Sequence, residues 1–278
     1  MAEETKISWA DATWSPWIGC TKVGPECAHC YAERDFDKRR GHAKWGTLEA
    51  GGTRVLTSPD YWKKPVAWNK QCASTATRMR VFPSLCDPFE DFKGNVQTAG
   101  GNGTLTSLSQ VRDLMFNLID ETPWIDWLLL TKRPENIAKF WHGGYRSNVW
   151  LGVSAGCQDS VDKMLPPLIE ASNVARWRFV SCEPLLGPVD LCDYLRRIDW
   201  VIVGGESGPQ SRAMDPVWVR SVRDQCVRYS VPFHFKQWGG PKAGGDALLD
   251  GRAYVDVPGA MLFEESGERT AESREGVA

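Results

Sequence analysis

The feature that most constrains the fold is a series of short apolar runs, each followed by polar residues and most of them then by apolar residues at helical spacing. The runs lie at 79–83, 127–130, 149–153, 178–180, 200–203 and 233–235. Such runs are typical of strands buried on both faces of a parallel sheet, and the helices supply the crossover connections. Because the pattern repeats evenly, the sequence predicts a single α/β domain, a partial or full parallel β/α barrel.

The remaining segments are less regular. Residues 7–19 alternate apolar and small polar residues and predict a first strand, and 31–40 is compatible with a helix. A loop is expected over 41–60, a flexible insert over 94–103, and a short helix over 191–197.

The chain divides near its C-terminal end. Residues 1–240 are assigned to the barrel with its N-terminal cysteine loop. Residues 241–278 are assigned to a closing segment and an acidic, mobile tail, with a turn predicted at Asp250-Gly251.

Composition limits the class of protein. The 278 residues are 42% hydrophobic and 24% charged, as in a folded domain, and the net charge of -2 creates no general attraction to nucleic acid. Residues 1–6 lack an apolar signal segment, and no apolar run is long enough to cross a bilayer, so a cytoplasmic protein without membrane association is expected. In that reducing compartment, clustered thiols among the nine cysteines are better interpreted as metal ligands than as disulfides.

Three cysteines, Cys20, Cys27 and Cys30, form a Cys-x6-Cys-x2-Cys array in one short loop. Three thiolates can hold one tetrahedral or cubane metal centre and leave one coordination position open. Zinc would need a fourth ligand, which His29, His42 or a distant thiol can supply. A cubane iron-sulfur cluster would instead keep one iron open.

Polar residues gather directly after the predicted strands. They are Ser84, Asp87, Thr131, Lys132, Ser154, Glu183, Glu206, Lys236 and Gln237. Because the carboxyl ends of parallel barrel strands meet at one mouth, where such barrels build their sites, we expect these side chains to lie together with Cys20. Taken singly, each is as readily a solvated loop residue or a helix cap.

Other residues allow two interpretations. Cys86, Cys157 and Cys182 follow predicted strands and can act as a fourth ligand or a thiol hydrogen donor, although buried inert thiols are commoner. Aromatic residues in predicted loops lie near cations that can contact phosphates while the rings stack on bases, or they anchor a solvated face. These residues are Trp45, Trp62, Trp68, Lys63, Lys64 and Lys70.

Several motifs carry a resemblance to a known group of enzymes. The segment from Gly19-Cys20 to Cys27-Ala28-His29-Cys30-Tyr31-Ala32 resembles the cluster loop of the radical S-adenosylmethionine (SAM) superfamily, near its spore photoproduct lyase-like branch. The segment Ser84-x-x-Asp87-Pro88-Phe89 resembles the second-strand segment of that branch. The motifs at 131–134, 152–154, 181–188, 204–208 and 235–239 resemble the phage- and prophage-associated family of radical-SAM-like proteins, so the likeness covers roughly residues 6–240.

The resemblance implies a cofactor and a set of roles. Cys20, Cys27 and Cys30 would ligate a 4Fe-4S cluster that binds SAM and cleaves it to a 5′-deoxyadenosyl radical. The implied cofactor-binding residues are Ser84, Asp87, Thr131, Ser154 and Gln237. The implied catalytic residues on the substrate side are Lys132, Glu183, Glu206 and Lys236. Six residues separate Cys20 from Cys27, where the superfamily usually has three, and Gly24-Pro25 is expected to fold the excess into a turn.

The expected function is that of a radical SAM enzyme of isomerase or lyase type. Its substrate would be a modified nucleobase, a hypermodified thymidine, in phage DNA, with a reducing electron donor as partner and the host cytoplasm as location. The alternatives are base repair or modification of a peptide or small molecule by the same chemistry, and a zinc- or cluster-stabilised nucleic-acid-binding protein that does not cleave SAM.

Overall fold

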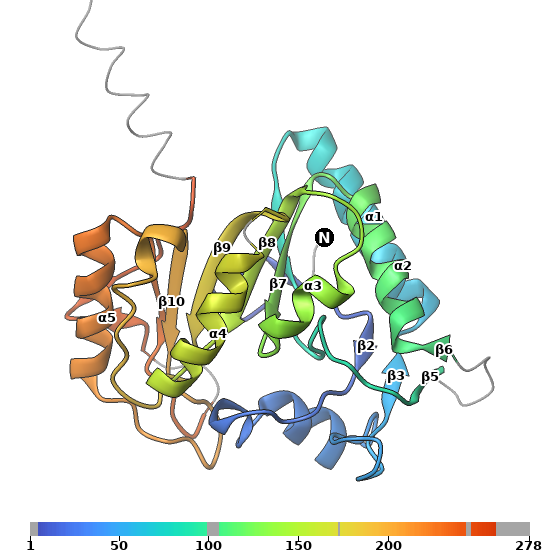
Figure 1. Cartoon of the computed structure of the whole chain (residues 1–278), viewed down its shortest axis with the longest axis horizontal. Coiled ribbons are helices and arrows are strands. Elements are labelled where there is room, and N and C mark those ends of the chain that lie inside the picture. The colour runs from blue at the N-terminus through green and yellow to red at the C-terminus, as the bar shows by residue number, and fades with distance from the viewer. Residues whose placement is uncertain (1–4, 99–105, 172, 243–245, 260–278) are drawn as a thin grey trace, which may run out of the picture.

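The computed structural model describes residues 5–98, 106–171, 173–242 and 246–259. Its central element is a seven-stranded sheet in which every pair of neighbouring strands is parallel. In spatial order the strands are β1 (Ala12–Thr13), β4 (Met79–Phe82), β7 (Ile125–Thr131), β8 (Arg146–Ser154), β9 (Ala175–Cys182), β10 (Trp200–Gly204) and β11 (Phe233–Gln237). The edge strands β1 and β11 are not paired with each other in the described chain, so the curved sheet is a partial barrel (Figure 1).

The helices lie on the outer face of this sheet (Figure 1). They are α1 (Pro59–Thr75), α2 (Leu108–Glu121), α3 (Ile137–Phe140), α4 (Gln158–Glu170) and α5 (Pro216–Tyr229). Local sequence sets where several of them begin. The Ser107 side chain accepts a hydrogen bond from the Gln110 backbone, and the Gln110 side chain returns one in a capping box. Asp215 caps α5, whose first position is Pro216.

The two faces of the sheet bury different residues, as the period of two in a strand requires. Leu128, Trp150, Phe179 and Trp200 belong to an aromatic-rich cluster on the inner face. Their neighbours on the same strands face the helices, where they pack against residues such as Met115, Val161 and Val222. The rings of Trp150 and Trp200 lie 5.7 Å apart, edge to face. Aromatic side chains therefore fill the inside of the partial barrel.

A small second sheet lies beside the cysteine loop. It contains β2 (Trp17–Ile18), β3 (Arg54–Leu56), β5 (Asn95–Thr98) and β6 (Thr106–Ser107). The single strand predicted over 7–19 is wrong, because Ala12–Thr13 pairs with β4 whereas Trp17–Ile18 pairs with β3. Pro16, which has no backbone N–H, lies between the two pieces.

The predicted loop and aromatic surface also need correction. The 41–60 segment holds β3 and the first two residues of α1, a helix that Pro65 in its interior obscures in the sequence. The region 191–197 forms only the short turn η4 (Leu195–Arg197). Trp62 and Trp68 lie in α1; Trp68 is buried, and Trp62 packs against the main core. Trp45 is buried too, although it lines the cavity described below, so Trp68 and Trp62 contribute to the fold rather than to an exposed aromatic surface.

Predictions elsewhere agree with the structure. The alternation of strands and helices is confirmed from α2 to β9 and from β10 to β11, whereas only the turn η4 lies between β9 and β10. The turn at Asp250-Gly251 joins the antiparallel strands β12 (Leu248–Leu249) and β13 (Arg252–Ala253). The flexible insert predicted over 94–103 is wrong at Asn95–Thr98, which forms β5 by pairing with β3 and β6, and its residues 99–103 lie outside the described residues. The acidic end from residue 260 lies outside them too. In the described ranges, no helix combines the length and apolar character needed to span a bilayer.

Candidate functional site

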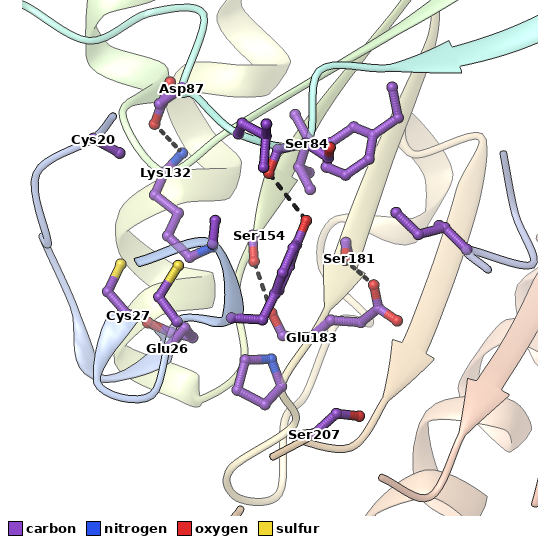
Figure 2. A pocket seen from close by; sticks show the side chains of 18 of the residues that line it. Cys20, Glu26, Cys27, Ser84, Asp87, Lys132, Ser154, Ser181, Glu183 and Ser207 are labelled. Carbon is purple, nitrogen blue, oxygen red and sulfur yellow. Dashed lines mark hydrogen bonds between the residues drawn. The ribbon is translucent and has the colours of Figure 1, made fainter. Parts of the chain in front are cut away.

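A cavity of about 390 Å³ lies at the carboxyl ends of the strands. All twelve residues that the sequence places in the site line it, and Figure 2 shows part of this lining. They are Cys20, Cys27, Cys30, Ser84, Asp87, Thr131, Lys132, Ser154, Glu183, Glu206, Lys236 and Gln237. The predicted gathering of strand-end residues around the cysteines is therefore present.

The thiol loop, residues 19–30, forms one wall. Cys20, Cys27 and Cys30 are half-buried and have free thiols. The predicted turn is present, since the Cys27 backbone N–H donates to the Gly24 carbonyl at 3.0 Å and residues Pro25–Cys27 form the helical turn η1. At the entry, Gly19 has a φ of 118°, and a Cβ there would lie 2.6 Å from the Thr53 carbonyl oxygen.

The donor chemistry of this wall suits an iron-sulfur cluster, because three free thiols on one cavity surface are the ligands that such clusters take. Within the described ranges, no group of three or more His, Cys, Asp or Glu side chains is drawn together as a ready-made metal site. The three cysteines thus share a wall without forming a closed ligand set.

Glu26, a residue that sequence reasoning missed, ties the loop to the start of α4. Its buried carboxylate accepts a hydrogen bond from the Gly156 backbone at 3.0 Å and one from the Cys157 thiol at 3.7 Å. Cys157 is thereby directed at Glu26, and Cys182 is fully buried in the main core. Of the three additional cysteines considered, Cys86 is the one that lines the cavity.

Asp87 links the segment after β4 to the end of β7. Its Oδ1 accepts from the Thr131 hydroxyl at 2.7 Å and the Phe89 backbone at 3.0 Å. Its Oδ2 accepts from the Lys132 backbone at 3.1 Å (Figure 2) and from Arg133 at 2.8 Å. Because both oxygens of this buried carboxylate already accept two hydrogen bonds, its contacts are internal to the protein. Its role toward a cofactor stays a prediction.

Arg133 is a second residue that sequence reasoning missed, although it directly follows Lys132 in the strand-end motif. Its guanidinium contacts Cys20 Sγ at 3.8 Å and donates to the Thr21 carbonyl at 2.6 Å. Burial alone would lower the pKa of Arg133, but the negative charges of Asp87 and then of Glu90 raise it above its ordinary value. The guanidinium therefore stays charged beside the first cysteine.

Glu206 connects the other half of the thiol loop to the end of β10. Its carboxylate contacts His29 Nδ1 at 2.9 Å and accepts two side-chain hydrogen bonds from Arg212, at 2.9 and 2.6 Å. Burial would raise the pKa of Glu206, but the hydrogen bonds from Arg212 and His29 outweigh it and hold the pKa at about 2. Arg212 also donates to the Pro25 carbonyl at 3.0 Å. The Glu206 carboxylate, which the sequence predicts to be catalytic, is therefore already bound to His29 of the thiol loop.

Glu183 lies on a different side of the cavity from Cys27 (Figure 2). Its Oε2 accepts from the Trp9 indole and the Ser181 hydroxyl, each at 3.2 Å, and Lys236 Nζ lies 3.2 Å from its Oε1. Nearby, the Ser154 hydroxyl donates to the Glu183 carbonyl at 3.0 Å. These contacts place a carboxylate and an ammonium next to each other at the wall facing away from the thiols.

Three further predicted residues differ in how they are held. Gln237 donates to the Ser207 hydroxyl at 2.6 Å, and the Ser84 carbonyl accepts from the Tyr31 hydroxyl at 3.0 Å. The Lys132 ammonium makes no hydrogen bond or ion pair with the described residues. It is therefore a cation at the cavity surface that is available to an anionic ligand group.

Comparison with known proteins places the chain in a family. The family described as "Protein of unknown function (DUF5131)" matches residues 4–258. The chain belongs to the DUF5131 family. That match includes every strand from β1 to β13 and every cavity-lining residue named above. Searches of curated proteins and of solved structures give no match to this chain.

Proposed function

We propose that the protein is a radical SAM enzyme in which Cys20, Cys27 and Cys30 hold a 4Fe-4S cluster. The observation that carries the proposal is that three free, half-buried thiols line one cavity at the carboxyl end of a partial parallel β/α barrel. When bound, such a cluster supplies an electron to SAM, whose cleavage gives a 5′-deoxyadenosyl radical. A reducing cytoplasm, including that of a phage-infected host, suits free thiols and the reduced cluster.

The residues near the thiols would bind and orient SAM. Lys132 offers an unpaired ammonium for its carboxylate, and the polar groups of Ser84, Thr131 and Ser154 line the same cavity. Gln237 completes this cofactor set. Apolar side chains that also line the cavity would exclude water from a reactive intermediate. They include Trp9, Phe82 and Leu130.

The wall that carries Glu183 and Lys236 would face the substrate. Their 3.2 Å ion pair offers one acceptor and one donor to a polar substituent. Glu183 and Lys236 would orient that substituent against the radical. Lys132 and Glu206, the other two residues predicted to be catalytic, lie nearer the thiol loop. A volume of about 390 Å³ suits a small-molecule-sized group. We assign a modified nucleobase, a hypermodified thymidine of phage DNA, which would have to enter flipped out of the helix and would be isomerised or cleaved there.

The cluster is tested by anaerobic purification with iron and acid-labile sulfide analysis. Wild type should bind iron and sulfide in near-equal amounts, and each of Cys20→Ala, Cys27→Ala and Cys30→Ala should lose the brown chromophore. Cys226→Ala, which removes a fully buried thiol of α5, is the matched control and should keep it. Stoichiometric zinc without iron in the native protein would overturn the radical assignment in favour of a zinc-stabilised protein.

The reaction is tested with the reconstituted cluster, dithionite and SAM. The expected product is 5′-deoxyadenosine, and its absence would favour a cluster-stabilised binding protein. Substrate choice is then tested with hypermodified phage-type DNA, free modified nucleosides and unmodified DNA. Turnover should depend on the modification. Equal turnover of all three substrates would exclude the modified base as the target, and no turnover of any of them would favour a peptide or small-molecule substrate.

A further inference from the structure

We infer that Arg133 is a positioning residue, which fixes the first half of the thiol loop before any cofactor binds. Its importance for a cluster rests on the proposed function, whereas its effect on the loop does not. The inference concerns a buried group of four charged side chains, here called the charge cluster: Arg54, Asp87, Glu90 and Arg133.

The charge cluster is closed by short contacts. Arg54 donates to both oxygens of Glu90 at 2.7 Å, and Arg133 donates to Asp87 at 2.8 Å. A further contact of 3.4 Å joins Arg133 to Glu90. Side-chain exposures are 0% for Arg54, 3% for Glu90, 7% for Asp87 and 9% for Arg133. Two arginines and two carboxylates balance in formal charge, as burial at this depth requires.

The charge cluster contacts the thiol loop at Cys20 and Thr21. One nitrogen of Arg133 contacts both Asp87 and the Cys20 sulfur, and the other donates to the Thr21 carbonyl. Arg54 donates to the Thr21 hydroxyl at 2.8 Å. The backbone is held as well, because the Gly46 N–H donates to the Cys20 carbonyl at 3.1 Å. A side chain, a carbonyl and a hydroxyl of adjacent residues are thus held by two buried guanidiniums.

The contacts that Arg133 makes need a planar guanidinium group with two terminal nitrogens. Its two terminal nitrogens reach partners on different sides, whereas a lysine ammonium is a single point charge. A lysine at this position would retain attraction to Asp87 and Glu90 but would lose the contacts to Cys20 and Thr21. Arg133→Lys therefore separates the charge of the side chain from its positioning effect.

The position of Arg133 beside Cys20 also matters for metal binding. Hydrogen-bond donors directed at ligating sulfur influence the potential and stability of a cluster, and partners of metal ligands contribute about 10- to 100-fold in metal affinity. With its guanidinium 3.8 Å from Cys20 Sγ, Arg133 is placed to act on that ligand.

The first test uses the reduced, metal-free full chain and hydrogen exchange. The Gly46 N–H donates to the Cys20 carbonyl and the Gly19 N–H to the Leu85 carbonyl, each at 3.1 Å, so both amides report on this half of the loop. In Arg133→Lys and Arg133→Met, we expect peptides containing Gly19 and Gly46 to exchange at least about 10-fold faster, while α4 is unchanged. Arg178→Lys alters a half-buried arginine that pairs with Asp199 elsewhere in the sheet and is the matched control. If Arg133→Met fails to fold, the hydrogen exchange of Arg133→Lys alone tests the inference. Unchanged exchange at Gly19 and Gly46 in a folded Arg133 variant would overturn the inference.

The second test uses Co²⁺ alone, because thiolate-to-cobalt charge-transfer absorption reports sulfur ligands without any activity. Wild type should show this absorption, and Arg133→Lys should bind Co²⁺ about 10-fold more weakly with a weaker band per bound ion. Arg178→Lys should match wild type. Equal affinity and absorption in Arg133→Lys would overturn the role of Arg133 toward the metal. Absence of the band in wild type would count against the cluster site instead, and the exchange test would still stand.

Discussion

His29 Nδ1 lies 2.9 Å from Oε2 of Glu206, a contact between residues 177 positions apart. It joins the short segment between the second and third cysteines to the end of β10. Arg212 reinforces it by bonding to Glu206 and to the Pro25 carbonyl. The second half of the thiol loop is therefore held by a carboxylate that is remote from it in the sequence.

Glu206→Gln should lower the free energy of unfolding by about 2 kcal/mol, because the amide loses the charge that Arg212 pairs with. The Glu206 side chain is only 5% exposed, so water does not replace the lost partner well. Urea denaturation monitored by tryptophan fluorescence measures the change. Asp250→Asn makes the same chemical change in an exposed pair with Arg220 and should cost less than about 1 kcal/mol. Equal costs for the two variants would contradict this assignment.

His234 should make the fold sensitive to mild acid. Burial lowers its pKa from 6.5 to about 4, against the raising effect of Glu183. In the folded state the ring therefore stays neutral while the unfolded chain takes up a proton. Stability that is present above pH 6.5 should be lost as the pH falls toward 4, by about 3 kcal/mol at about 1.4 kcal/mol per pH unit.

The measurement is the free energy of unfolding at several pH values for wild type and His234→Gln. The variant has no imidazole to protonate, so its stability should vary much less across this window. Its amide can replace the contact of Nε2 with Ser8, which is 2.8 Å in the protein. A slope as steep as that of wild type would show that another group is responsible.

Gly152→Ala should destabilise the inner aromatic cluster. An added Cβ would lie 2.4 to 2.6 Å from three ring atoms of Phe179, which is fully buried. Moving that ring also disturbs its contact with Trp200, so we expect a loss of about 2 kcal/mol in thermal or urea unfolding. Gly187→Ala is the control, because nothing lies within 4 Å of its added Cβ. Its effect should stay within about 0.5 kcal/mol.

Glu183→Gln should separate the two sides of the proposed site. The amide keeps an oxygen for Trp9 and Ser181 but loses the charge that pairs with Lys236. Formation of 5′-deoxyadenosine without substrate should stay within about 3-fold of wild type, while conversion of the modified nucleobase falls at least about 100-fold. Liquid chromatography of both products measures this. Loss of 5′-deoxyadenosine to the level of Cys27→Ala would place Glu183 on the cofactor side.

Much of the architecture could be predicted because local patterns specify it. The apolar runs that became β7, β8 and β10 are too short for helices and too apolar for a solvated face. Once they form parallel strands, their carboxyl ends must share one edge, and this is why residues as distant as Ser84 and Gln237 line the same cavity.

Prediction from local sequence patterns failed where a proline interrupts the pattern. Pro65 hides α1, although Ser58 and Pro59 are a normal helix start, and the alternation across 7–19 conceals a change of sheet at Pro16. The buried state of Trp45 and Trp68 was equally hidden, because Lys44 precedes Trp45 and Asn69-Lys70 follows Trp68.

The sequence by itself determined the parallel strands, the three-thiol loop and the set of residues around the cavity, since each depends on spacing along the chain. The tertiary structure alone decided which of those residues are free to meet a ligand. Asp87 and Glu206 have the same chemistry as Glu183, yet their oxygens are taken up by Arg133 and by His29 and Arg212. Lys132 has no such partner among the described residues. Hydrogen-bond partners depend on distances between segments remote in sequence, and these distances exist only once the chain has folded.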